Sequence, residues 1–197
     1  MKQGVVSVFA AFVCGGLLDA SAVESFSVSC RQREIPEAGY VKEMVINADQ
    51  LELSFIPPVY WRTASEANGL RWTWASRDST ALLSLSVRVD PKQTAVPPNV
   101  DAMRKVVLDR YPESRVVEQF RCYSAGGQGQ TFDLEQPVDL TLKRFIRVAQ
   151  VQFQGGAVEF TLVTSKTAFP EYRHAMTGLM NSFRVAVPPK KPSVAKK

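Results

Sequence analysis

A single histidine, His174, is the first candidate for a catalytic group, and it lies within residues 167–187, TAFPEYRHAMTGLMNSFRVAV. A catalytic histidine of the serine-hydrolase type has to meet a carboxylate and an activated nucleophile. Helical spacing puts His174 beside Arg173 and Thr177, on the side away from the apolar residues of this stretch. No G-x-S-x-G sequence accompanies it. We therefore expect a solvated helix residue, and an envelope enzyme that uses His174, with Ser182 or a carboxylate, remains an alternative.

Two pairs of acidic residues, Asp133 with Glu135 and Glu113 with Glu118, lie close enough in the sequence to raise the question of acid–base chemistry. Catalysis by two carboxylates needs environments that separate their pKa values. The neighbouring sequence provides no such difference, and unpaired acids stay at the surface. These carboxylates are predicted to face solvent, and no catalytic residue is assigned.

Cys30 and Cys122 are the two cysteines that remain when the first 22 residues are set aside, and in an exported chain they predict a disulfide. Two buried free thiols are the alternative. Neither cysteine has a second Cys or His at the spacing of a metal site. The glycine-rich AGGQGQ also lacks the Lys-Ser/Thr pair of a phosphate loop. No cofactor or metal is therefore expected.

The N-terminus has the pattern of an export signal. A lysine at position 2 precedes the apolar run GVVSVFAAFVCGGLL, and DASA follows with alanines at positions 20 and 22. This order predicts a signal peptide over residues 1–22, cleaved after Ala22, and hence a periplasmic or secreted protein. An uncleaved N-terminal anchor is the alternative, which the two glycines of the run and the early Asp19 disfavour.

The net charge of +5 is concentrated at the C-terminus, where four lysines lie in the last eight residues, KKPSVAKK. Nucleic-acid binding needs many basic groups along one face, so no nucleic-acid partner is expected. The tail, residues 187–197, has nothing to bury and is predicted to be disordered. It is either a solubilising end or a weak electrostatic contact with an anionic lipid or cell-wall surface.

Alternating apolar and polar residues predict strands along most of the chain between these ends. One hairpin carries Trp72 and Trp74 on the same face, where they form part of a core or of a binding platform. Residues 23–44 have only a weak pattern and form a poorly defined segment. The predicted strands cover residues 51–55, 70–89 with a turn, 115–124, 130–136 and 139–165 with a turn.

Two stretches change to helical periodicity. Asn99 is a good N-cap for the first helix, which Pro112 ends. Pro170 lies near the start of the second helix, which Thr167 is placed to cap. The apolar stripes are Val100, Met103, Val107 and Tyr111 in the first helix and Tyr172, Met176, Leu179, Met180 and Phe183 in the second. We predict an α+β fold, with an antiparallel sheet covered by the two helices, in one domain over residues 45–186.

These features together resemble the PsbP-like family, the extrinsic subunits of photosystem II and their bacterial relatives. The resemblance rests on the IPPVYW bend after the first strand, the tryptophan-bearing hairpin, the mid-chain helix, the glycine-rich turn and the closing SFR helix. It covers residues 45–185 and is a likeness of element order more than of motif. It implies an α/β/α sandwich and a non-enzymatic exported module that docks on a larger assembly or binds a partner through one face, the partner being an unknown protein or an envelope component. No residue roles are carried over, because the family has no active-site signature.

Exposed aromatic and basic residues are the candidates for a binding face on such a module. An ordinary polar strand face is the alternative for these positions. A small-ligand carrier is a second possibility, with an apolar pocket between sheet and helices lined by Trp72, Trp74 and Phe160. The binding-face candidates are Trp61, Arg62, Arg71, Lys143, Arg144 and Arg147.

Overall fold

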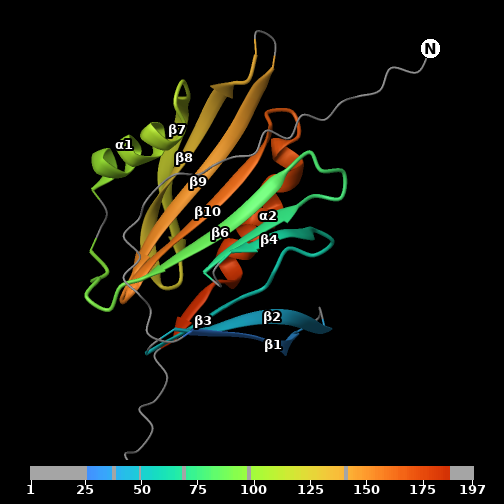
Figure 1. Cartoon of the computed structure of the whole chain (residues 1–197), viewed down its shortest axis with the longest axis vertical. Helices are drawn as coiled ribbons and strands as arrows, with labels where there is room; N and C mark the ends of the chain where they lie inside the picture. Colours follow the sequence, from blue (N-terminus) through green and yellow to red (C-terminus); the bar gives the residue numbers. More distant parts are fainter. Residues whose placement is uncertain are drawn as a thin grey trace, which may run out of the picture.

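The computed structural model describes residues 26–36, 39–48, 50–67, 70–96, 99–139 and 142–186, and within them the chain forms two antiparallel sheets and two helices (Figure 1). The predicted signal peptide and the predicted basic tail lie outside the described residues.

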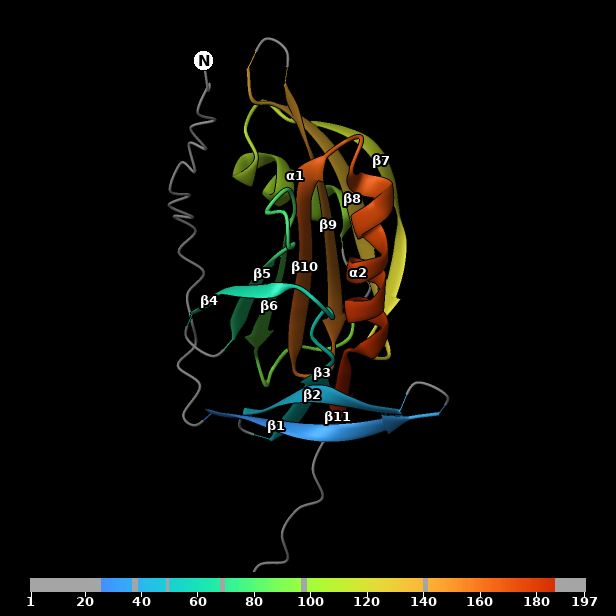
Figure 2. The same cartoon turned by 90° about the vertical axis from the view of Figure 1, so that its right-hand side faces the viewer.

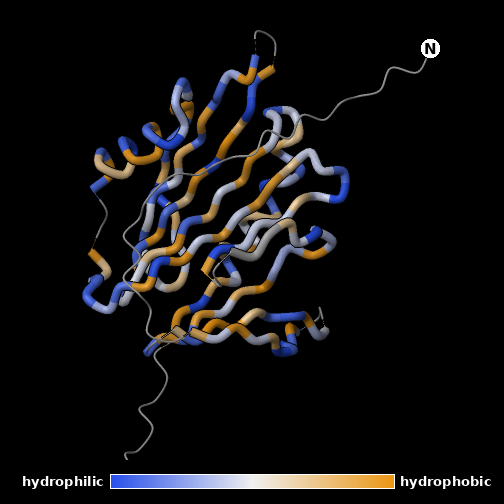
Figure 3. The backbone as a smooth tube through the Cα atoms, in the orientation of Figure 1, coloured by the Kyte–Doolittle hydropathy of each residue, from blue (hydrophilic) through white to orange (hydrophobic). Residues whose placement is uncertain are grey.

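The larger sheet has seven strands and contains both predicted hairpins. Its order is β4-β5-β6-β10-β9-β8-β7. Trp72 pairs with Leu85 in the first hairpin, and Val158 pairs with Val151 in the second, so both hairpin predictions are confirmed. The strands are β4 (Arg62–Ala67), β5 (Arg71–Ala75), β6 (Leu82–Val89), β7 (Arg115–Ser124), β8 (Gly127–Pro137), β9 (Lys143–Phe153) and β10 (Gly156–Ser165). Apolar and polar residues alternate along these strands (Figure 3).

The glycine-rich segment is a turn, as predicted, but the strand after it begins earlier than the sequence suggested. β8 already starts at Gly127, and its glycines pair closely with β9. A Cβ at Gly129 would lie 1.9 Å from the carbonyl oxygen of Gln150, so no larger residue fits there without a backbone shift.

Helices α1 (Val100–Arg110) and α2 (Phe169–Ser182) lie on opposite faces of this sheet (Figure 2). On β9, Ile146 and Val148 pack in the cluster that contains Met103 and Val107 of α1. The alternate residues Ala149 and Val151 belong to the cluster that contains Met176 and Leu179 of α2. Within the described ranges, neither helix has the length and apolar character needed to span a bilayer.

The predicted cover by two helices is only partly correct. α1 packs over β8 and β9, whereas the same face of β5, β6 and β10 carries polar side chains that need no helix above them. These polar residues are Arg71, Thr73, Ser84, Ser86, Arg88, Glu159 and Thr161.

The two helices begin differently. The side chain of Asn99 accepts hydrogen bonds from the backbone N–H groups of Asp101 and Ala102, both at 3.1 Å, so the predicted cap of α1 is confirmed. In α2 the N-cap is Ala168, with no side-chain cap, and the predicted role of Thr167 is wrong. Ser165 accepts from the backbone N–H of Ala168 instead, at 3.2 Å.

A second, four-stranded sheet in the order β1-β2-β3-β11 corrects the prediction that residues 23–44 are poorly defined. Leu53 and Phe55 are fully buried and join its inner face to the main core beside Trp72 and Phe183. The strands are β1 (Phe26–Ile35), β2 (Gly39–Ala48), β3 (Leu51–Phe55) and β11 (Arg184–Ala186).

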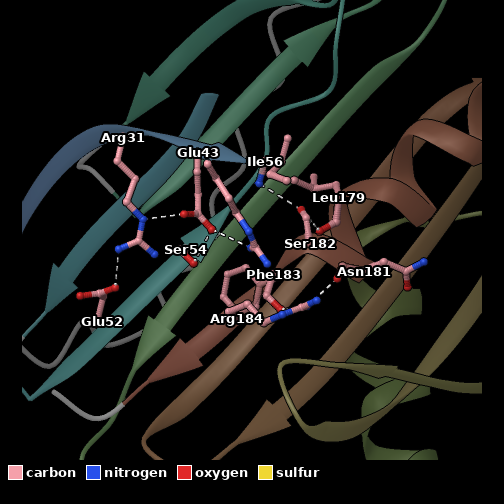
Figure 4. Close-up of polar contacts among 11 residues, drawn as sticks. Arg31, Glu43, Glu52, Ser54, Ile56, Leu179, Asn181, Ser182, Phe183 and Arg184 are labelled. Atoms are coloured by element: carbon pink, nitrogen blue, oxygen red, sulfur yellow. Dashed lines mark hydrogen bonds and ion pairs between the residues drawn. The ribbon is translucent and has the colours of Figure 1, made fainter. Parts of the chain in front are cut away.

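Glu43 holds three strands of the small sheet together on its outer face (Figure 4). Its carboxylate is 1% exposed and accepts from Arg31 Nε at 2.6 Å, Arg33 Nη1 at 3.0 Å and Ser54 Oγ at 3.1 Å. Burial acts to raise the pKa of Glu43, but the hydrogen bonds from Arg31, Ser54 and Arg33 outweigh it, and the net effect is a lowered pKa.

The predicted disulfide is absent. Cys30 lies on β1 of the small sheet and Cys122 on β7 of the large one, and both are free thiols. Cys30 is exposed, whereas Cys122 is buried, and its burial raises the pKa of its thiol.

Candidate functional site

The loop of residues 56–61 joins the two sheets and exposes two large apolar side chains. Val59 is 63% exposed and Tyr60 is 74% exposed. Tyr60 has φ 67°, in the left-handed region that a bulky residue rarely adopts. Such strain persists where the surroundings enforce it, and it is concentrated at functional sites. This loop is therefore the first candidate for a binding surface.

Contacts on both sides hold the loop in place. The Trp61 ring packs edge-on against Tyr172 of α2, with centroids 5.6 Å apart. The guanidinium of Arg77 lies 4.8 Å from the centre of the Tyr60 ring, a cation–π contact on the exposed side. Ser182 Oγ accepts from the backbone N–H of Ile56 at 3.0 Å and donates to the Leu179 carbonyl at 2.9 Å (Figure 4).

A second anchor fixes α2 to the turn before β6. Tyr172 donates its hydroxyl to Asp78 at 2.9 Å, and Asp78 also accepts from Ser76 at 2.6 Å and from Thr80 at 2.8 Å. These hydrogen bonds, that from Ser76 first, hold the pKa of Asp78 well below its usual range. The loop, the turn and the helix thus form a preorganised surface.

An apolar cleft of about 240 Å³ runs between this loop and α2. Pockets that enclose drug-sized ligands are about 300–1,000 Å³, so this cleft suits a single side chain better than a whole small molecule. The space beside Gly178 is open, because a Cβ at that position would meet no atom within 4 Å. The cleft is lined by Ile56, Pro57, Pro58 and Val59 of the loop and Ala175, Gly178, Leu179 and Ser182 of α2.

Basic and acidic side chains both lie near the cleft. Arg62 is exposed and donates to Ser79 Oγ at 2.7 Å, next to Arg77. His174 is exposed and lies one helical turn before Gly178 on the same stripe of α2. Of the acids nearby, Asp78 is engaged by Tyr172, whereas Glu171 is exposed one helical turn before Ala175 of the cleft lining.

The arrangement does not support a catalytic role for His174. Ser182 lies eight residues later in α2, which is about 12 Å of helix rise, beyond hydrogen-bond reach. The Ser182 hydroxyl donates to the Leu179 carbonyl rather than to a base. His174 is exposed, as the sequence predicted. Within the described residues, His, Cys, Asp and Glu side chains also form no group of three that could hold a metal.

The prediction that Asp133 and Glu135 face solvent is wrong, because both carboxylates are buried in ion pairs on the α2 face of β8. Asp133 accepts from Arg147 at 2.6 Å on each oxygen. Glu135 accepts from Lys166 at 2.6 Å and Arg115 at 2.7 Å, and these hydrogen bonds lower its pKa to about 2. Glu135 is thus held in the charged form, and both carboxylates serve as structural groups.

The predicted binding-face residues do not gather on one face. Trp61 and Arg62 belong to the candidate site, whereas Arg71 lies on the face that carries α1. Arg147 is enclosed by its ion pair and lies against the rings of Phe120 and Phe169, 5.0 and 4.6 Å from their centres.

The remaining two, Lys143 and Arg144, lie at the start of β9. Arg144 is half-buried and Lys143 is exposed, and neither lines the cleft beside α2. The six candidates therefore occupy separate places.

The predicted pocket residues Trp72, Trp74 and Phe160 are core. Phe55 packs edge-on against Trp72 at 5.1 Å and Trp74 at 5.9 Å between ring centroids, and Phe160 packs on Phe183 at 5.8 Å. Protein side chains occupy the space where the ligand was expected. A second, more polar cleft of about 370 Å³ lies between the β7–β8 turn and the end of α2, and it does not include them.

No protein-family model matches the sequence, and no curated protein matches it significantly. Solved structures similar to this chain include the cyanobacterial PsbP of Synechocystis sp. PCC 6803, with 13% identity, a TM-score of 0.44 and coverage of 89% of this chain and 99% of that one. LpqN of Mycobacterium tuberculosis, described as involved in cell envelope biogenesis, has 9% identity, a TM-score of 0.47 and coverage of 82% and 91%. PA94 of Pseudomonas aeruginosa, a putative regulator, has 13% identity, a TM-score of 0.39 and coverage of 75% and 91%.

The solved structures similar to this chain thus include a PsbP protein, and the sequence was found to resemble the same family. At these identities and TM-scores the likeness carries no residue roles, partners or activities to this chain.

Proposed function

We propose that this chain is an exported, non-enzymatic binding module that holds an extended, acidic protein segment at the cleft between residues 56–61 and α2. One apolar side chain of that segment fills the cleft, and its acidic neighbours lie against Arg62 and Arg77 beside the loop. The observation that carries the proposal is the exposed Val59, which lines an apolar cleft and precedes Tyr60, an exposed residue in a left-handed conformation.

Burial of apolar surface supplies the main attraction in this proposal. Val59 and the prolines beside it lose contact with water when the anchor enters. The contacts of Ser182 with Ile56 and of Tyr172 with Trp61 keep the loop from having to reorganise. Because little ordering entropy is lost, even a small cleft can contribute useful affinity.

The two arginines beside the loop supply the selectivity. Arg62 and Arg77 favour carboxylates next to the anchor, and cations there are disfavoured. The electrostatic part is screened by salt because these groups are exposed. Export to the periplasm or medium is supported by the N-terminal sequence pattern.

The purified chain can test the proposal on an array of short peptides that vary in the central residue and in the charge of its flanks. We expect selection of acidic peptides with a central Leu, Ile or Phe, and loss of signal with a central Ala or with lysine flanks. Binding should weaken as salt rises.

Two leucine variants separate the cleft from a general effect on α2. Gly178→Leu places a side chain in the cleft and should abolish the selection. Thr177→Leu adds the same side chain at an exposed neighbouring position outside the cleft lining and should leave it intact. An array with no selected peptides, or one on which both variants behave alike, would refute the proposal.

A further inference from the structure

A row of polar side chains crosses the large sheet on the face that carries α1. Its residues are directly paired from strand to strand, so they share one face and lie in one line. Neighbouring strands are about 4.8 Å apart, so the row is about 24 Å long from β5 to β7. This polar row consists of Arg71, Ser86, Glu159, Gln150, Gln130 and Arg121, in that order.

The ends of the polar row carry arginines that form no ion pair with any described residue. Arg88 follows Ser86 by two residues on β6, so it is the diagonal neighbour of Arg71, with Cα atoms about 7–8 Å apart. Arg121 lies at the other end, and all three guanidinium groups are exposed. Two cations as close as Arg71 and Arg88 repel each other, and an anion bound between them removes that repulsion.

Two acidic groups on the strands of this face lie near the row, and their contacts are made elsewhere. Glu159, in the middle of the row, accepts from Arg110 of α1 and from Gln150 at 2.6 Å. The Asp90 carboxylate, just after β6, accepts from the backbone N–H of Lys92 at 3.0 Å. The row therefore has cationic ends and a middle of hydroxyl and amide groups, in which the one acid is already paired.

We infer that this face binds an acidic polysaccharide, a linear sugar polymer that carries carboxylates. One carboxylate lies between Arg71 and Arg88 and another against Arg121, because guanidinium groups bind carboxylates through paired hydrogen bonds. The sugar hydroxyls meet Ser86 and the glutamine amides of the row, which can both donate and accept. A polymer that crosses the strands engages both ends of the row at once, so weak contacts add up to useful affinity.

The side chains of the row are poorly suited to the other anionic partners. A nucleic acid needs basic groups at many phosphates and aromatic rings for its bases. A lipid surface needs apolar side chains that insert below the headgroups. The row offers neither. It also lies on the face of the sheet opposite to α2 (Figure 2), so the inference does not rest on the peptide site beside that helix.

The test is binding of the purified full chain to polygalacturonate at low salt, measured by isothermal titration calorimetry beside two polymers that each lack one feature. Dextran has sugar hydroxyls without carboxylates, and polyglutamate has carboxylates without sugar hydroxyls. We expect polygalacturonate to bind, polyglutamate to bind about tenfold more weakly and dextran not to bind. Equal binding of polyglutamate overturns the assignment to a polysaccharide, and a chain that does not bind polygalacturonate overturns the inference.

Two double variants locate the site. Arg71→Gln with Arg88→Gln should weaken polygalacturonate binding about tenfold. The control, Lys42→Gln with Arg173→Gln, removes the same charge at exposed positions outside this face and should bind like wild type. Both should keep the Tm of wild type in the absence of polymer. Both also retain the lysines at the C-terminus, so equal binding by the two variants would refute the site on the sheet.

Gly178→Leu separates this site from the peptide site. It fills the cleft beside α2 and should leave polygalacturonate binding unchanged. A loss of polygalacturonate binding in Gly178→Leu would place the polymer at α2 and contradict the inference, whatever the peptide array shows.

Discussion

Gly178 in α2 allows a direct test of how the cleft is built. Ala is more favourable than Gly inside a helix by about 1 kcal/mol, in part because Gly leaves the unfolded chain more freedom. Position 178 lies within the helix, and a Cβ there would meet no atom within 4 Å, so no clash offsets the gain. Gly178→Ala should therefore raise the free energy of unfolding by about 1 kcal/mol. For a chain of this size that corresponds to a rise in Tm of about 2–4 °C.

The assay is thermal and urea unfolding of wild type, Gly178→Ala and Thr177→Ala. Thr177 is exposed, and its hydroxyl donates to the Arg173 carbonyl within the helix, so Thr177→Ala is the control for helix propensity outside the cleft. Both variants should be more stable than wild type, and only Gly178→Ala should weaken peptide binding. A Tm for Gly178→Ala at or below that of wild type would refute the conclusion that the space beside Gly178 is open.

Two further predictions concern the ion pairs and the helix cap. Lys166 and Arg115 lower the pKa of Glu135 to about 2, whereas a glutamate in the unfolded chain has a pKa of about 4.3. The ionised Glu135 therefore stabilises the folded state fully above pH ~4.3. This stabilisation disappears as the pH falls toward about 2. Glu135→Gln should therefore lower the urea midpoint at neutral pH, and its difference from wild type should shrink as the solution is acidified; a difference that grows in acid would contradict this sign. Asn99→Ala removes two hydrogen bonds of 3.1 Å at the start of α1 and should cost about 1 kcal/mol of unfolding free energy in the same assay, whereas an unchanged midpoint would show that the cap is dispensable.

Residues with regular periodicity could be placed from the sequence. A strand or helix with one buried side shows a regular spacing of apolar residues in the sequence. This spacing identified the buried pair Trp72 and Trp74 in a strand and the buried pair Met103 and Val107 in a helix. β1 was missed because nearly all of its residues are exposed on both faces, and without a buried side there is no period-2 signal.

The polar side chains were harder to predict because their partners are distant in the sequence. Asp133 meets Arg147 only when β8 and β9 pair, and Lys166 reaches Glu135 from beyond the end of β10. The IPPVYW segment was recognised as a bend and Trp61 as a candidate. The left-handed conformation of Tyr60 and the cleft beside it depend on contacts with Arg77 and α2, which no local pattern contains.

The small sheet also bears on how the chain reaches its native state. β11 pairs with β3, and Ser182 accepts from the backbone N–H of Ile56, so segments more than a hundred residues apart must meet before this sheet is complete. Such long-range closure is slow. During synthesis, β3 emerges from the ribosome well before β11, so one edge of β3 stays unpaired until residues 184–186 have been made.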